Sequence, residues 1–193
     1  MRKQTRPPEP DVLRENAATW NQEWVQKAAS GNAANFSWHG AREKIVTALQ
    51  QMNQAHCCFC DCFPLADRSN EPIEHFRPKS RFHDEAYTWA NLYYICEACN
   101  TAKREKFEAE LLRPDSQDYE FQEYFDFDHT NGEMRPNPTV DIANQARAAS
   151  TIRIYDLDSA ERRRNRCLEL RKWNKSSDRE IDEWGYRDYL EKA

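Results

Sequence analysis

Two cysteine pairs in the middle of the chain share one spacing. Cys57 and Cys60 are separated by two residues, and so are Cys96 and Cys99. Such a pair lets one tight turn present two sulfurs to one ion, and zinc prefers four tetrahedral thiolate or imidazole ligands. The repeated spacing therefore predicts a structural Zn²⁺ site that these four cysteines form.

The first pair has neighbours that leave its register open. Cys58 and Cys62 form an alternative pair, and His56 could also reach the ion. The chain holds seven cysteines, an odd number, and its polar start lacks the hydrophobic segment of an export signal. Metal binding in a reducing compartment is therefore favoured over a disulfide framework. We favour Cys57 and Cys60 because their spacing repeats that of the second pair.

The loop between the two pairs contains an acid–base cluster. Residues 61–95 separate the pairs, which is more than a plain zinc ribbon needs, and Glu74 directly precedes His75 within them. An imidazole titrates near pH ~6.5, which suits a general base that takes a proton from water. The oxygens of Glu74 and Asn100 are hard ligands that favour Mg²⁺ or Mn²⁺ over zinc. These residues indicate hydrolytic chemistry beside the zinc site.

The order of these motifs resembles that of the HNH endonucleases and their ββα-metal site. A C-x2-C turn is followed by the Glu74–Lys79 stretch (EHFRPK), by Asn91-Leu92, and by a second C-x2-C turn that runs into Asn100 and Lys103. The EHFxPK signature is similar to that of a subgroup that includes PtuB, the HNH subunit of Septu and retron-linked anti-phage systems. The resemblance covers residues 57–103 most closely and extends along residues 111–114, the region around Gly132, and residues 152–157.

The resemblance implies a role for each motif residue. His75 is the general base, and Asn91 orients it or ties the loop. Glu74 and Asn100 hold the catalytic Mg²⁺ or Mn²⁺ ion. Three basic side chains contact the substrate phosphates, and these are Arg77, Lys79 and Lys103. Glu74 stands where the broader family more often has aspartate, and Asn100 where it often has histidine, so one metal ligand is longer and the other is weaker.

The function that this resemblance implies is metal-dependent endonucleolytic hydrolysis of nucleic-acid phosphodiester bonds, by the effector nuclease of an anti-phage defence complex. DNA is the default substrate of the motif, and RNA such as tRNA is the other substrate considered. The implied partners are a PtuA-like ABC-type ATPase and, in retron-linked systems, a reverse transcriptase with its DNA–RNA product. The alternative is a non-catalytic zinc module that binds nucleic acid or a partner protein. The intact Glu74, His75 and Asn100 favour the enzyme.

Helices are expected before this core. Apolar residues at helical spacing predict one helix from Asp11, as its cap, toward Ser30, and a second from about Gly40 to Gln54. These helices belong to a helical N-terminal segment, residues 1–54, that precedes the zinc-clamped nuclease core, residues 55–113.

A hairpin and a further helix are expected after the core, in residues 114–193. Residues 124–134 predict a β-hairpin with Asn131-Gly132 at its turn. A last helix begins near Asp158-Ser159 and carries the basic run of residues 162–166, interpreted as a solvated face with a nucleic-acid patch as the alternative. Cys167 is assigned to an ordinary position in that helix.

The amino-acid composition restricts the fold class and the kinds of function that the chain can have. The chain has 193 residues, 32% of them charged, and only four glycines, which favours one compact, helix-rich unit. We therefore expect an α+β fold, with a ββα-metal (HNH, His-Me finger) core closed by a four-cysteine zinc site and surrounded by mainly helical segments. No apolar run is long enough to cross a bilayer, so a cytoplasmic protein without a membrane partner is expected. The net charge of -5 argues against a polycationic nucleic-acid binder but allows a local phosphate site.

Overall fold

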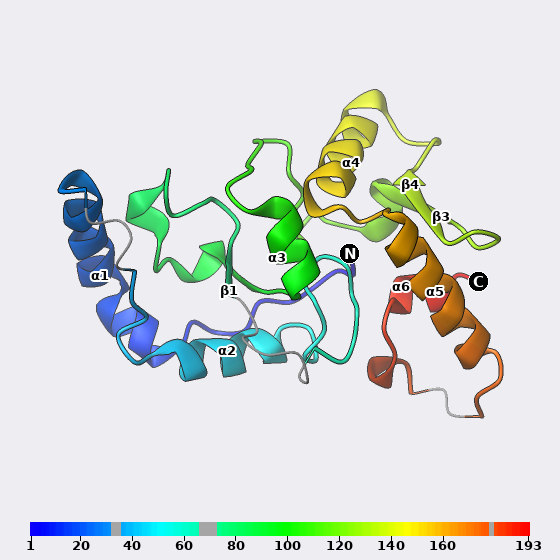
Figure 1. Ribbon diagram of the computed structural model, residues 1–193, viewed down its shortest axis with the longest axis horizontal. Coiled ribbons are helices and arrows are strands. Elements are labelled where there is room, and N and C mark those ends of the chain that lie inside the picture. Colours follow the sequence, from blue (N-terminus) through cyan, green and yellow to red (C-terminus); the bar gives the residue numbers. More distant parts are fainter. Residues whose placement is uncertain (32–35, 66–72, 178–179) are drawn as a thin grey trace.

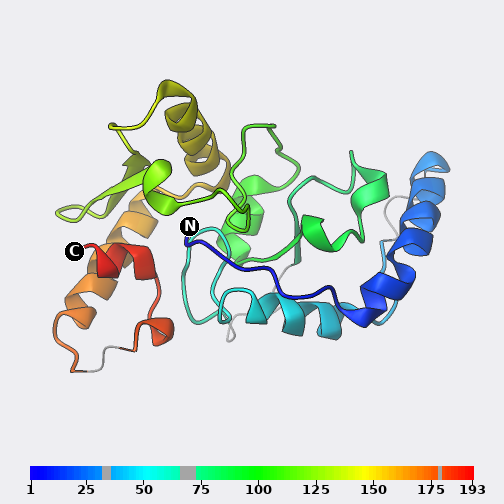
Figure 2. The ribbon, with the colours of Figure 1, turned by 180° about the vertical axis from the view of Figure 1, so that it is seen from behind.

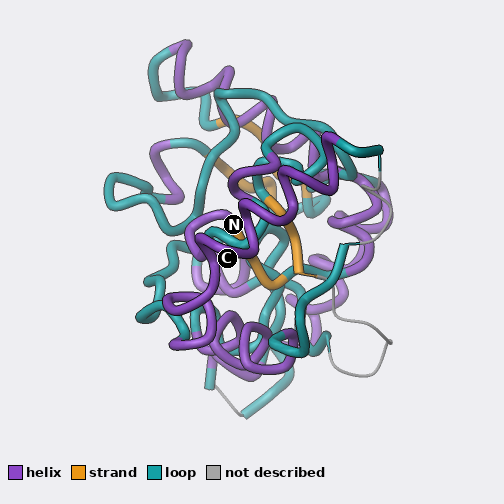
Figure 3. Tube along the Cα trace, turned by 90° about the vertical axis from the view of Figure 1, so that its left-hand side faces the viewer, coloured by secondary structure: helices purple, strands orange, loops and turns teal. Residues whose placement is uncertain are grey.

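The computed structural model describes residues 1–31, 36–65, 73–177 and 180–193 (Figure 1). This part of the chain contains two small antiparallel sheets among helices and long connecting loops, as Figure 3 shows by secondary structure. The α+β class predicted from the sequence is confirmed. The helices are α1 (Asp11–Ala29), α2 (Arg42–Gln51), α3 (Glu97–Lys103), α4 (Ile142–Tyr155), α5 (Ala160–Trp173) and α6 (Arg187–Glu191). The strands are β1 (Ile73–His75), β2 (Leu92–Tyr94), β3 (Phe125–Asp128) and β4 (Glu133–Pro136).

The central unit of the fold consists of β1, β2 and α3. Strand β1 pairs with β2 in antiparallel register, with Glu74 opposite Tyr93 and His75 opposite Leu92. All three residues of β2 are buried, so this short sheet lies inside the molecule. Two residues separate β2 from α3, which lies in the middle of the view near β1 (Figure 1).

The first helix covers the loop that follows β1. Its span confirms the predicted helix, and its buried residues are Leu13 and Trp24. The indole Nε1 of Trp24 donates to the carbonyl of Lys79 at 3.1 Å, which fastens the helix to that loop. The cap was predicted wrongly, because Pro10 is the N-cap and Asp11 is the first helical residue. Proline suits this boundary because it has no N–H to leave unsatisfied.

The N-terminal segment joins distant parts of the chain. Residues 1–10 run along the back of the molecule from α1 to its centre, as seen from behind (Figure 2). The Gln4 side chain donates to the carbonyl of Cys58 at 2.9 Å, and the Gln4 backbone N–H donates to the carbonyl of Pro114 at 2.9 Å. The Arg6 guanidinium pairs with Asp115 at 2.7 Å. This segment therefore links the first cysteine turn to the chain beyond α3.

The predicted hairpin is confirmed as β3 and β4, with a longer loop than expected. Asp128 is paired with Glu133, so four residues rather than two connect the strands. Gly132 adopts a φ of 77°, and a Cβ there would lie 2.4 Å from the Arg163 carbonyl oxygen. Glycine is required at this position because both the backbone conformation and the packing of α5 exclude a side chain.

Two arginines of the basic run on α5 are buried, so the run is not the fully solvated face expected from the sequence, although Arg164 is exposed. Arg162 and Arg166 are 7% and 2% exposed, respectively. Arg166 donates to the carbonyls of Gly132 and Leu157, while Arg163 pairs with Glu133 at 3.0 Å. These arginines stabilise the packing of the C-terminal half, and of the three only Arg163 is partly exposed.

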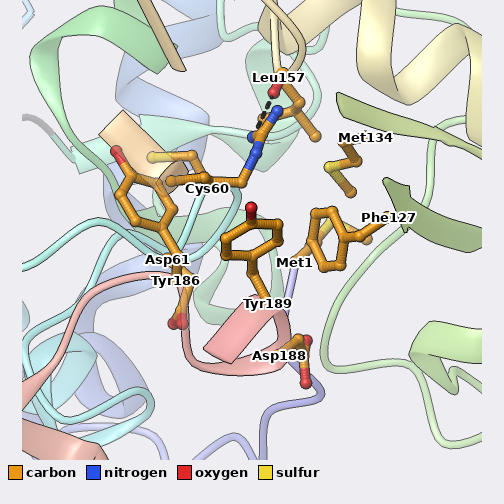
Figure 4. A pocket seen from close by; sticks show the side chains of 10 residues that line it. Met1, Cys60, Asp61, Phe127, Met134, Leu157, Tyr186, Asp188 and Tyr189 are labelled. Carbon is orange, nitrogen blue, oxygen red and sulfur yellow. Dashed lines mark hydrogen bonds between the residues drawn. The ribbon is translucent and has the colours of Figure 1, made fainter. Parts of the chain in front are cut away.

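The C-terminal segment docks on the first cysteine turn through a buried ion pair. Arg187 Nη2 lies 2.7 Å from Asp61 Oδ1, with both side chains almost fully buried. The Tyr186 N–H also donates to the Asp61 carbonyl at 2.6 Å. Figure 4 shows this region from close by, with Tyr186 beside Cys60 and Tyr189 beside Phe127. The cavity left there measures about 10 Å³, at the lower limit for one water molecule, so the contact is tightly packed.

The helices in the described ranges are too short or too polar to cross a membrane.

The Asp61–Arg187 pair should be among the most important polar contacts for stability. Arg187→Ala leaves a buried carboxylate without its cation, and we expect a loss of about 3–5 kcal/mol in unfolding free energy, measured by urea denaturation. Arg135→Ala is the matched control, because its pair with Asp126 is exposed and should contribute at most about 1 kcal/mol. Equal losses of unfolding free energy in the two variants would show that the buried pair does not stabilise the docking of the C-terminal segment.

Candidate metal centre and active-site cleft

Four cysteine sulfurs gather between the first cysteine turn and the start of α3. The Sγ atoms of Cys57, Cys60, Cys62 and Cys96 all lie within 4.8 Å of one another. Those of Cys60 and Cys96 are 3.6 Å apart. Tetrahedral zinc with Zn–S bonds of about 2.3 Å separates its sulfurs by about 3.8 Å. The number, chemistry and spacing of these thiols fit a metal ion such as zinc.

The backbone around the sulfurs is arranged to favour thiolates. The N–H of Cys96 points to the sulfur of Cys57 at 3.4 Å, and the N–H of Cys99 to that of Cys96 at 3.4 Å. The second contact caps α3, whose positive N-terminal end favours negative charge. Hydrogen bonds from neighbouring thiols, that of Cys57 foremost, lower the pKa of Cys60 and that of Cys96.

A fifth sulfur and a buried arginine complete the cluster. Cys99 is fully buried, and burial, followed by the neighbouring Cys57 and Cys60, raises the pKa of its thiol. Its sulfur accepts a hydrogen bond from Arg162 Nη2 at 3.1 Å. Burial alone would lower the pKa of Arg162, but the cysteines, Cys60 first, more than offset this and raise it. Arg162 therefore supplies positive charge to a group of thiols that becomes negative when it binds zinc.

The structure places the residues near the first cysteine pair whose part in zinc binding the sequence left open. Cys62 is one of the four closest sulfurs, in the place that the sequence assigned to Cys99, whereas Cys58 and Cys99 are outside that group. The backbone N–H of Cys58 donates to the Tyr94 carbonyl at 2.9 Å, and burial raises the pKa of its thiol to about 12. The ring nitrogens of His56 lie 2.7 Å from the carbonyl of Gln54 and 2.9 Å from that of Trp184, so neither points at the sulfurs.

A cleft of about 540 Å³ lies beside the cysteine cluster. It is lined by strand β1, the loop that follows it, and α3. Four residues singled out from the sequence meet there, and these are Glu74, His75, Lys79 and Asn100. Arg77, Asn91 and Lys103 are not among the lining residues.

His75 is held with one ring nitrogen available as a base. Its Nε2 lies 2.9 Å from the Ala86 carbonyl, which can only accept, so Nε2 carries the proton and Nδ1 is the free acceptor of the neutral ring. Burial, followed by the charge of Lys79, lowers the pKa of His75 to about 3. The ring packs between Trp38, stacked at 5.5 Å, and Phe36, edge-on at 5.4 Å. The expected titration near pH ~6.5 is therefore replaced by a ring that stays neutral at neutral pH.

Asn91 fixes the loop that follows β1. Its Oδ1 accepts from the Arg77 N–H at 2.7 Å, and its Nδ2 donates to the carbonyls of Arg77 at 3.0 Å and Glu85 at 3.1 Å. The Arg77 side chain itself pairs with Glu85 at 2.6 Å and lies over the Phe82 ring at 4.0 Å. Both residues thereby stabilise the loop that carries Ala86, the partner of His75.

Lys103 is completely buried under the cleft. Its ammonium forms an ion pair with Glu74 Oε1 and donates to the His75 carbonyl at 3.0 Å. Burial raises the pKa of Glu74 to about 7, although Lys103 acts in the opposite direction. A phosphate contact was expected of Lys103, but its ammonium faces the protein interior. The sequence does contain a signal for this, since Lys103 lies four residues after Cys99 and shares its buried helix face.

The chain is similar in sequence to a curated bacterial protein. No protein-family model matches it. It is 31% identical over 98 residues to Septu protein PtuB of Bacillus thuringiensis. The matched region is 51% of this chain and 35% of PtuB, so the chain covers about a third of that relative. The similarity confirms the predicted relation to PtuB.

The cysteine cluster should bind zinc and depend on it for stability. Cys96→Ser removes one of the four closest sulfurs and should lower zinc content and Tm together, because metal binding and folding are coupled. Cys167→Ser is the matched control, since that cysteine is outside the group, and it should leave zinc content unchanged. Both quantities can be measured by elemental analysis and thermal denaturation of the same preparations.

The cluster has five thiols, one more than the four ligands that zinc takes, so we expect one of them to be replaceable. Cys62→Ser and Cys99→Ser should each retain zinc with weakened affinity, because the remaining thiol can complete the tetrahedron. The double variant should lose zinc. Complete loss of zinc from one single variant alone would instead identify that cysteine as the fixed fourth ligand.

Glu74 should make stability fall as pH rises. Its pKa of about 7 in the folded state exceeds the ordinary 4.5, so the folded protein keeps a proton that the unfolded chain releases between these values. In Mg²⁺-free buffer we expect the unfolding free energy of the native protein, relative to Glu74→Gln, to fall by about 2 kcal/mol between pH 5 and 7.5. Parallel pH profiles for the two proteins would show that Glu74 is not a strongly buried acid.

Proposed function

We propose that this chain is a metal-dependent endonuclease of the HNH type, which hydrolyses nucleic-acid phosphodiester bonds as the nuclease of an anti-phage defence complex. The observation that carries the proposal is the His75 ring, whose Nε2 contacts the Ala86 carbonyl and leaves Nδ1 available, in one cleft with the side-chain oxygens of Glu74 and Asn100. The order β1, β2, α3 supports a ββα-metal core. The similarity to PtuB supports the role in defence.

The cleft residues supply the groups that hydrolysis requires. His75 Nδ1 would accept a proton from the attacking water while Nε2–H remains bonded to the Ala86 carbonyl, so the ring cannot rotate away from the substrate. Lys79 lines the cleft and would bind a phosphate oxygen. Asn91 would act as a positioning residue, because it holds the loop that carries Ala86.

Two oxygen ligands fit a hard divalent ion. Glu74 is buried at the edge of the cleft, and only the cation of Lys103 pairs with its Oε1 among the described residues. Asn100 offers an amide oxygen from α3 on the same cleft. Mg²⁺ or Mn²⁺ held there would stabilise the charge that develops on the phosphate. Structural zinc would be held separately by the predicted set of Cys57, Cys60, Cys96 and Cys99, with Cys62 available to it.

A partner that delivers the substrate is part of this proposal. The chain has a net charge of -5, which opposes unaided binding to nucleic acid. We propose a PtuA-like ABC-type ATPase as this partner, on the basis of the similarity to PtuB. Residues 55–113 would form the nuclease core, with the flanking segments 1–54 and 114–193 supporting it.

Substitution of the general base tests the function. His75→Ala should reduce plasmid or tRNA cleavage in Mg²⁺ by about 10²–10⁴-fold and should leave zinc content unchanged, with no rescue by added metal. Glu74→Ala and Asn100→Ala act through the ion, so raised Mg²⁺ or Mn²⁺ should partly restore their activity. His129→Gln is the control, because that histidine contacts the Tyr189 carbonyl at a distance from the cleft. Cleavage by folded, zinc-loaded His75→Ala at the native rate would favour the non-catalytic zinc module.

A further inference from the structure

The end of α3 carries two consecutive basic residues with opposite environments. Lys103 is fully buried, and Arg104 is exposed and lines the cleft. The Lys103 ammonium forms an ion pair with Glu74 and donates to the His75 carbonyl at 3.0 Å and to the Arg104 carbonyl at 3.4 Å. Because the side chain is 0% exposed, its ammonium is directed into the protein and away from a substrate in the cleft.

The backbone at Arg104 explains the difference between the two residues. Its φ is 48° and its ψ is -124°, a conformation that side-chain-bearing residues rarely adopt and that costs about 1–3 kcal/mol. The Arg104 N–H donates to the Asn100 carbonyl at 2.9 Å, and Lys103 holds its carbonyl. These two bonds fix the strained residue in the lining of the cleft. Strain of this kind persists where the surrounding structure over-determines it, often at binding sites.

The charges around the cleft leave Arg104 available for an anion. Among the residues that the structure describes, no carboxylate pairs with the Arg104 guanidinium. Glu105 also lines the cleft, but its carboxylate accepts a hydrogen bond from Ser80. Lys79, which comes from the loop after β1, provides a second cation, and its ammonium lies 5.0 Å from the centre of the Phe36 ring. The two cations come from different elements, with Glu74, His75 and Asn100 also on the cleft.

From this arrangement we infer that Arg104, and not Lys103, is the phosphate-binding residue of α3, and that a nucleic-acid backbone crosses the cleft between Arg104 and Lys79. The inference rests on the proposed nuclease function and names how that site binds its substrate. Lys103 is then a positioning residue, which holds Glu74 and the backbone of Arg104. A guanidinium suits this role because it binds two phosphate oxygens at once.

Salt-dependent binding tests the assignment independently of cleavage. The probes are fluorescein-labelled 20-nucleotide oligo(dT) and oligo(U), titrated by fluorescence anisotropy from 20 to 200 mM NaCl with the full chain carrying His75→Ala to prevent hydrolysis. Arg104→Gln should weaken binding about tenfold at low salt, as expected for one charge-assisted contact. It should also reduce the slope of log K against log[salt] by about 0.7, the value for one phosphate contact to a single strand.

Three further variants separate the two roles. Arg164→Gln is the matched control, an exposed arginine of α5 away from the cleft, and should change neither affinity nor slope. Lys103→Gln should lower Tm, because it leaves Glu74 without its cation, but should keep the salt slope. Arg104→Gly should weaken binding as much as Arg104→Gln does. It should not lower Tm, because glycine adopts the φ of 48° without strain.

The outcomes distinguish the inference from the proposed function. An unchanged slope in Arg104→Gln, a slope reduced by Lys103→Gln instead, or no binding of either oligonucleotide at 20 mM salt would overturn the inference. Displacement of the oligonucleotide by equimolar inorganic phosphate would also overturn it, because the site would then bind a free phosphate and not a backbone. If Arg104→Gln reduces the salt slope as expected but the native chain cleaves neither DNA nor RNA, the nuclease function is rejected and the binding assignment is kept.

Discussion

The gathering of cysteine sulfurs from two distant turns is the constraint on which the rest of the structure depends. The turn at residues 57–62 and the start of α3 are far apart in sequence, and the sulfurs bring them within 4.8 Å. Between them lie β1, the loop after it and β2, so the strand that carries Glu74 and His75 belongs to a closed loop. The two paired strands are only three residues long and would not be stable alone. Closure at the cysteines therefore holds the cleft together.

Burial of the cleft changes the charge state of both residues that carry the proposed chemistry. The pKa of Glu74 rises to about 7 and that of His75 falls to about 3, and in both cases burial is the first cause. Each shift favours the neutral form of its group. For His75 the neutral form is the one that accepts a proton. For Glu74 the charged form is needed to bind a cation. The ammonium of Lys103, which pairs with Glu74, favours this charged form and partly offsets the effect of burial.

Local motifs could be predicted from the sequence, whereas burial and long-range contacts could not. The cysteine pairs, Glu74, His75 and Asn100 were recognisable because their chemistry is expressed in short spacings. The role of Arg162 was missed because its partner Cys99 is 63 residues away, and a basic run is ordinarily a solvated face. Helix α4 was missed for a different reason. Its buried residues include Ala148, Ser150 and Thr151, and its first residue, Ile142, is 84% exposed, so it shows no apolar stripe.

The seven residues of α3 connect the cysteine cluster to the cleft. Cys96, the N-cap of α3, and Cys99 contribute sulfurs to the cluster, Lys103 pairs with Glu74, and Asn100 lines the cleft. A helix this short does not form alone in water, so its stability must come from these contacts. Adjacent residues, Cys99 and Asn100, thus offer a soft sulfur to one site and a hard oxygen to the other. Because zinc prefers thiolates and Mg²⁺ prefers oxygen, the cysteine cluster and the proposed Mg²⁺ site could share one helix and still select different ions.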